Sequence, residues 1–98
     1  MADITQLEDK TVLRLDHDLV AATVPEIKHQ LKELVNQGGP IAVDLDKVRM
    51  IDSTGIGLLM AAHNSLQKND HVLEVLNASK DIVKLFQTMR LDKRFAVS

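Results

Sequence analysis

The run IAVDL at residues 41–45 places a short apolar segment between two longer segments whose apolar residues recur every three or four positions. A run of this length is typical of a strand that is buried on both faces and is too short for a stable helix. The longer segments have the spacing of amphipathic helices. Because helices on both sides of a strand require crossover connections, we expect an α/β fold with a mainly parallel sheet.

Four further strands are expected from short apolar or β-branched runs that are separated by turns. They lie at residues 4–7, 11–15, 71–76 and 95–97. The first two flank a polar turn and form an antiparallel hairpin. The sequence therefore predicts one domain, residues 1–98, with a mixed, mainly parallel sheet of about five strands and three helices.

The helix boundaries are predicted from capping and stop signals. Thr23 should begin the first helix in a capping box with Glu26, with Pro25 in the first turn, and residues 38–40 should end it. Ser79 should cap the third helix, which leads into a polar connection at residues 90–94. The apolar face of the third helix is expected to be Ile82, Val83, Leu85, Phe86 and Met89. The side chains expected to fill the core also include Met50 and Met60, with His63 partly buried and hydrogen-bonded.

Composition argues against several classes of protein. The 12 basic and 14 acidic residues are well mixed, and Phe86 and Phe95 are the only aromatic residues, so nucleic-acid binding is not expected. The absence of cysteine excludes disulfides and thiolate metal sites. The four histidines form no metal-binding pair, and Asp44 and Asp46 are not expected to bind Mg²⁺, so neither a metal nor a cofactor is predicted. The polar start and the lack of a long apolar run indicate a cytoplasmic protein without direct membrane insertion.

The stretch MIDSTGIGLLM at residues 50–60 places an acid, two hydroxyls and two glycines inside apolar sequence at the start of the second helix. The N-terminus of a helix carries a partial positive charge and unpaired N–H groups, and can hold a phosphate. Four interpretations compete. In the first, Ser53 is an N-cap and the glycines ease packing. In the second, Ser53 is a hydrolase nucleophile, although G-x-S-x-G is missing, and in the third the glycines bind a nucleotide, although G-x-x-x-x-G-K is missing. In the fourth, Ser53 is a substrate for phosphorylation within a docking surface.

The segment IDSTGIGLL resembles the signature of the STAS domain of bacterial anti-sigma factor antagonists, and TVLRLDHDLVAATVPEI, IAVDLDKVRMIDSTGIGLL and LDKRFAV are similar to other parts of that family. The resemblance implies a non-enzymatic partner-switching protein that is phosphorylated at Ser53. Its implied partners are a serine kinase of the histidine-kinase-like ATPase fold, which is also the anti-sigma factor, and a PP2C-type phosphatase. The unmodified protein would bind the kinase, and phosphorylation would release it.

The resemblance also implies a partner-binding surface around the start of the second helix. Its predicted members are Asp52, Ser53, Thr54, Gly55, Ile56, Gly57 and Leu58, with Asp18 from the loop after the second strand. Gly55 and Gly57 are expected to allow a partner to approach the backbone, and Leu58 is expected off the inward stripe of its helix.

Two departures from the family pattern stand in this sequence. His17 and Val20 occupy loop positions where the family often has Gly and Asp, and the usual C-terminal helix is expected to be absent after the last strand. Two other functions stay open: a STAS subunit of a membrane-associated lipid or anion transport complex, and a signalling scaffold that does not act on a sigma factor.

Overall fold

The computed structural model describes residues 2–98 and contains, in this part of the chain, five strands, three α-helices and one short 3₁₀ turn. The elements are β1 (Asp3–Gln6), β2 (Thr11–Arg14), α1 (Val24–Asn36), β3 (Ile41–Asp44), α2 (Ser53–Gln67), β4 (Glu74–Leu76), α3 (Lys80–Thr88), η1 (Leu91–Lys93) and β5 (Ala96–Val97).

The sheet has the strand order β1-β2-β3-β4-β5. β1 runs antiparallel to β2, and every other neighbouring pair is parallel, which confirms the predicted mixed sheet. The strand expected at residues 71–76 begins only at Glu74, since the N–H of Leu73 donates to Nδ1 of His63 at 3.2 Å and not to a strand. The strand expected at 95–97 is likewise shorter and starts at Ala96.

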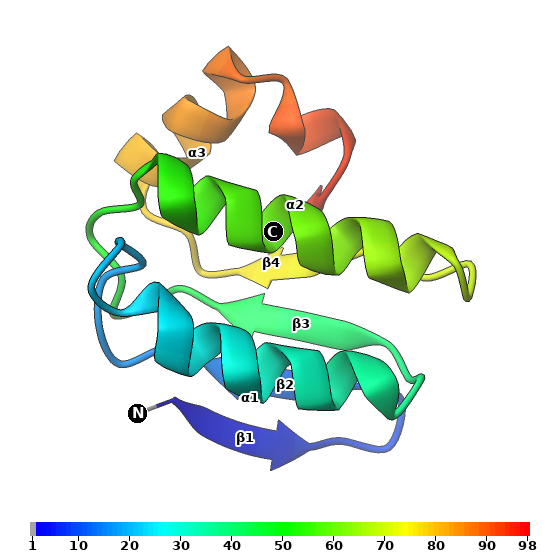
Figure 1. Cartoon of the computed structure of the whole chain (residues 1–98). Helices are drawn as coiled ribbons and strands as arrows, with labels where there is room; N and C mark the ends of the chain where they lie inside the picture. The colour runs from blue at the N-terminus through cyan, green and yellow to red at the C-terminus, as the bar shows by residue number, and fades with distance from the viewer. Residues whose placement is uncertain (1) are drawn as a thin grey trace.

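Helices α1 and α2 run side by side over one face of the sheet, and α2 lies between α1 and α3 in Figure 1. All four residues of β3 are buried, as expected for the central strand. Beyond α2, the ring of Phe86 on α3 meets the ring of Phe95 edge to face at 5.7 Å. The position of α2 in the middle of the helical layer means that it is packed on several sides.

Two cap predictions have different outcomes. Ser79 caps α3 as predicted, because its side chain accepts a hydrogen bond from the N–H of Ile82 at 3.2 Å. The predicted capping box of α1 is wrong, since Thr23 makes no side-chain cap bond. Its hydroxyl instead donates to the carbonyl of Asp18 at 2.6 Å and accepts from the N–H of Val20 at 3.1 Å. Thr23 therefore shapes the loop before the helix and not the first turn of the helix.

Three expectations about the core are wrong. Met50 and Met89 are 60% and 46% exposed, because Met50 lies in a loop and Met89 follows the last residue of α3. Met60 does pack against the core. The connection at residues 90–94 is not wholly polar in its packing, since Leu91 within it is buried.

His63 on α2 is more deeply buried than expected, at 2% exposure. Its Nδ1 accepts from the N–H of Leu73, and its ring meets that of Phe95 edge to face at 5.4 Å. Burial, and secondarily the positive charge of Arg94, lowers the pKa of His63 below its ordinary value. The folded protein therefore favours the neutral imidazole.

This burial predicts a pH dependence of stability. The unfolded chain takes up a proton on His63 near pH ~6.5, whereas the folded chain resists it, so the contribution of neutral His63 is complete above that pH and is lost as the pH falls below it. The slope reaches at most about 1.4 kcal/mol per pH unit. Urea unfolding at several pH values from about 7.5 down to about 5 measures this slope. Carboxylates stay largely ionised over this range, so their titration contributes little to the slope.

The matched variant for this test is His63→Gln, which keeps an acceptor for Leu73 but does not titrate. We expect the variant to lose most of the slope. The lowered pKa values of Asp44 and Asp52 act only at more acidic pH, below about 4. Equal slopes in the two proteins would contradict the assignment to His63.

Candidate functional site

Two loops, at residues 15–23 and 45–52, meet at the start of α2. Leu19 of the first loop and Ile51 of the second form a single parallel bridge. The N–H of Leu19 donates to the carbonyl of Met50 at 3.0 Å, and the N–H of Asp52 donates to the carbonyl of Leu19 at 3.2 Å. Backbone hydrogen bonds therefore hold the two loops against each other.

A carboxylate from each loop adds to this connection. Oδ1 of Asp18 accepts from the N–H groups of Arg49 and Met50, at 2.8 and 3.2 Å. Conversely, Oδ2 of Asp52 in the second loop accepts from the N–H of Ala21 in the first loop, at 2.9 Å. We call Asp18 and Asp52 with these bonds the loop clamp. Asp18 was predicted as a partner-binding residue, and the structure shows that its side chain holds the second loop.

Asp52 is also the N-cap of α2. Its backbone is extended, and its Oδ1 accepts from the N–H of Gly55 at 2.9 Å. The N–H groups of Gly55 and then Ala21 stabilise the carboxylate and hold the pKa of Asp52 below its usual range. The interpretation of Ser53 as the N-cap is therefore wrong, since Asp52 has that role.

Ser53 is the first residue of α2, and its side chain is exposed. Its hydroxyl makes no hydrogen bond with any residue in the described part of the chain. The adjacent positive end of the helix favours a negative charge at this position. A phosphoryl group could be attached to this hydroxyl without breaking a bond inside the described structure.

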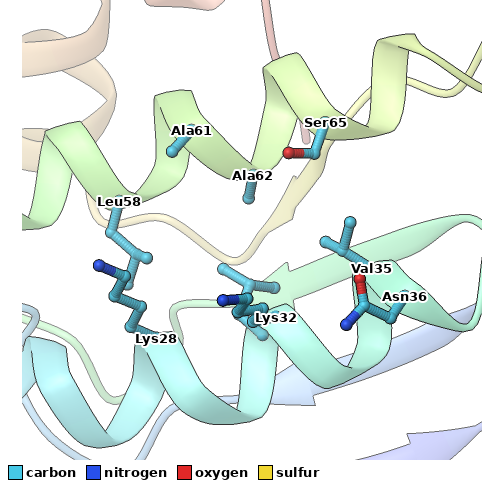
Figure 2. A pocket seen from close by; sticks show the side chains of 9 residues that line it. Lys28, Lys32, Val35, Asn36, Leu58, Ala61, Ala62 and Ser65 are labelled. Atoms are coloured by element: carbon cyan, nitrogen blue, oxygen red, sulfur yellow. The ribbon is translucent and has the colours of Figure 1, made fainter.

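The predicted partner-binding residues divide into three groups by exposure, of which the first is the half-buried pair of the loop clamp, Asp18 and Asp52. Ser53, Thr54 and Gly57 are exposed, whereas Gly55, Ile56 and Leu58 are buried. The expectation for Leu58 is wrong, since its side chain points into the space between α1 and α2 (Figure 2). The buried arc of α2 is wider than a single stripe because neighbouring elements pack on both of its sides.

The two glycines of the motif have different surroundings. A Cβ added to Gly55 would lie 2.3 Å from the carbonyl oxygen of Leu19 and 2.9 Å from Cγ2 of Ile51. A Cβ added to Gly57 would meet nothing within 4 Å. Gly55 therefore permits close packing of the loops, and only Gly57 lies open to an external surface.

Helix α2 has an uncharged surface. The sequence of its 15 residues, STGIGLLMAAHNSLQ, contains no Asp, Glu, Lys or Arg. Its exposed positions next to Ser53 are therefore small or uncharged, and the exposed Met50 lies in the loop just before them. Sequence reasoning missed this surface, although the absence of charge across residues 53–67 was available as a signal.

The described residues 2–98 offer no group of three or more potential metal ligands. Asp44, considered above with Asp46, accepts from the N–H of Asp46 at 2.9 Å and from Nδ2 of Asn77 at 3.1 Å, and it pairs with Arg14. Its carboxylate is thus occupied by the protein. No helix among these residues is both long and apolar enough to cross a membrane.

The model of the STAS domain family matches residues 1–98. The chain belongs to the STAS domain family. This STAS domain is 34% identical over 85 residues to a protein named anti-sigma-B factor antagonist from Staphylococcus aureus, a match that covers 85% of this chain and 79% of that protein. The predicted membership of the STAS family, which rested first on IDSTGIGLL at residues 51–59, is therefore confirmed.

Solved structures share the fold of this STAS domain. An anti-sigma-factor antagonist (STAS) domain protein from Planctomyces limnophilus superimposes with a TM-score of 0.89 at 19% identity, over 98% of this chain and 87% of that one. The Bacillus cell fate determinant SpoIIAA in its phosphorylated form gives a TM-score of 0.72 at 21% identity, over 100% of this chain and 91% of that one. At these identities the likeness shows the fold alone.

Proposed function

We propose that this STAS domain is an anti-sigma factor antagonist whose binding is controlled by phosphorylation of Ser53. Unmodified, it binds a serine kinase of the histidine-kinase-like ATPase fold that is also the anti-sigma factor, and phosphorylation releases it. A PP2C-type phosphatase restores the binding form. The domain itself is not an enzyme, and it acts in the cytoplasm.

The observation that carries this proposal is the exposed hydroxyl of Ser53 at the first position of α2, on the part of the surface that the loop clamp holds in place. The S. aureus relative is named an anti-sigma-B factor antagonist, and SpoIIAA, which shares the fold, has a phosphorylated form. Both names support the assignment.

The electrostatics of the site explain how a phosphate would act. A phosphoserine adds about −1.5 to −2 charges at pH 7. The positive end of α2 tolerates this charge, so the domain need not refold. A partner that packs over Gly57 would instead meet a bulky dianion next to the carboxylate of Asp52. Local repulsion and steric exclusion are then sufficient for release.

The proposal predicts that Ser53→Ala abolishes phosphorylation without unfolding the domain. Because Asp52 and not Ser53 caps α2, the free energy of unfolding should change by less than about 0.5 kcal/mol. The assay incubates the protein with ATP and each kinase of this fold from the same organism, and mass spectrometry locates the phosphate.

The control for this assay is Thr54→Ala, which removes the neighbouring exposed hydroxyl. We expect the control still to be phosphorylated, at Ser53. Labelling of Ser53→Ala would place the phosphate elsewhere. If no kinase of this fold labelled the wild-type protein, partner switching by phosphorylation would be refuted.

A further inference from the structure

A groove with a volume of ≈ 250 Å³ lies between α1 and α2 (Figure 2). Its lining residues are mostly apolar: Leu31 and Val35 from α1 and Leu58, Ala61 and Ala62 from α2. Pockets that hold a whole small-molecule ligand usually measure about 300–1,000 Å³. This groove is smaller, and its volume suits one large apolar side chain of a protein partner better than a cofactor.

Two lysines of α1, Lys28 and Lys32, line the same groove. They lie one helical turn apart, and neither makes an ion pair with any described residue. Glu33, the acid next to Lys32, contacts His29 at 3.4 Å instead. Because α2 has no charged side chain, the charge of the two ammonium groups is not balanced from the other wall of the groove. Two like charges at this spacing oppose each other until an anion arrives.

The groove and the site at Ser53 share helix α2. Leu58, which lines it, lies in the second turn of the helix that begins at Ser53. The exposed surface between the two contains Gly57, which has no side chain. A protein that docks on Ser53 therefore lies within about two helical turns of the groove.

We infer that this groove binds an acidic segment of the same partner that docks at Ser53. The segment inserts one large apolar side chain between α1 and α2, and its carboxylates pair with Lys28 and Lys32. Side chains that fill such pockets are typically the ones that contribute most of the binding energy of an interface. The identity of the partner rests on the proposed function, whereas the charge and size of the groove do not.

The test measures, by calorimetry, the affinity of the kinase that labels Ser53 for the double variant Lys28→Glu, Lys32→Glu. We expect the affinity to fall at least tenfold, and the remaining affinity to depend less on salt. The control is Lys80→Glu, Lys84→Glu, which makes the same charge change at two exposed lysines one turn apart on α3. The control should bind within about twofold of the wild-type protein, as expected for a charge outside the interface.

An unchanged affinity of the groove variant, or an equal loss in the control, would overturn the inference. A melting curve of each variant shows whether it is folded. These exposed lysines are not part of the core, so both variants should melt near the wild-type protein.

A second measurement does not depend on the kinase. The isotopically labelled domain is titrated, at millimolar concentrations, with the acidic peptide acetyl-EELEE-amide and with its basic counterpart acetyl-KKLKK-amide. The acidic peptide should shift the amide signals of Leu58, Ala61 and Ser65, and the basic peptide and the Lys28→Glu, Lys32→Glu variant should show no such shift. If the acidic peptide causes no shifts, the inference about the groove is refuted, even where a kinase labels Ser53. If the acidic peptide causes these shifts but no kinase labels Ser53, only the proposed function is refuted.

Discussion

Replacing Gly55 by alanine is expected to lower the free energy of unfolding by about 2 kcal/mol or more. The added Cβ would lie 2.3 Å from the carbonyl oxygen of Leu19 and 2.8 Å from its Cγ. Such overpacking typically costs about 1–3 kcal/mol, and here a backbone atom must move. The better helix propensity of alanine returns at most about 1 kcal/mol. Urea unfolding followed by far-UV circular dichroism measures the difference.

The backbone bonds between the two loops explain why the neighbouring chain does not yield easily at Gly55. The carbonyl of Leu19 accepts the N–H of Asp52, so moving it also strains the joint between the loops. Gly57→Ala is the matched control, since its Cβ meets nothing within 4 Å, and it should be as stable as the wild-type protein or more so. If Gly55→Ala were stabilised as much as this control, the close contact with Leu19 would not restrict the fold.

The second large effect is expected at Gly57, where leucine should weaken binding of the kinase at least tenfold, or by about 1.4 kcal/mol. The position is exposed and open, so the leucine would hold a partner away from the helix without disturbing the core. Replacement of a helical glycine stabilises by up to about 1 kcal/mol. The variant should therefore melt at the wild-type temperature or above while it loses affinity, as measured by calorimetry.

The paired outcome at Gly57 separates binding from folding. Gly57→Ala should show a smaller loss of affinity than Gly57→Leu, because a methyl group displaces the partner less. A Gly57→Leu variant that bound the kinase normally would remove this position from the interface. A destabilised variant would show that Gly57 also serves internal packing.

Periodicity predicted the elements of this domain well because the pattern is local. The buried run at residues 41–45 and the helical spacing around it were sufficient for the order of strands and helices. Ser53 was correctly placed at the start of α2 for the same reason. Ser79 was correctly predicted as a cap since its partner, the N–H of Ile82, lies only three residues away in the sequence.

Interactions between distant residues account for the expectations that were wrong. The environment of Gly55 depends on Leu19, which lies in another loop, so the spacing of glycines alone could not separate its role from that of Gly57. The hydroxyl of Thr23 is hydrogen-bonded to the backbone of Asp18 and Val20 and not to the first turn of the helix. Leu58 was expected to be off the buried side of α2 because it lies outside a single apolar stripe. It is buried since α2 has neighbours on more than one side.

The free hydroxyl of Ser53 has a thermodynamic consequence for modification and folding. Asp52 supplies the cap of α2, and no bond inside the described chain uses the Ser53 side chain. The positive end of α2 favours the added charge, whereas the adjacent carboxylate of Asp52 opposes it. A modified and an unmodified copy should therefore have similar melting temperatures. Most of the free-energy difference between them would then appear in the complex, so the modification would change binding far more than folding.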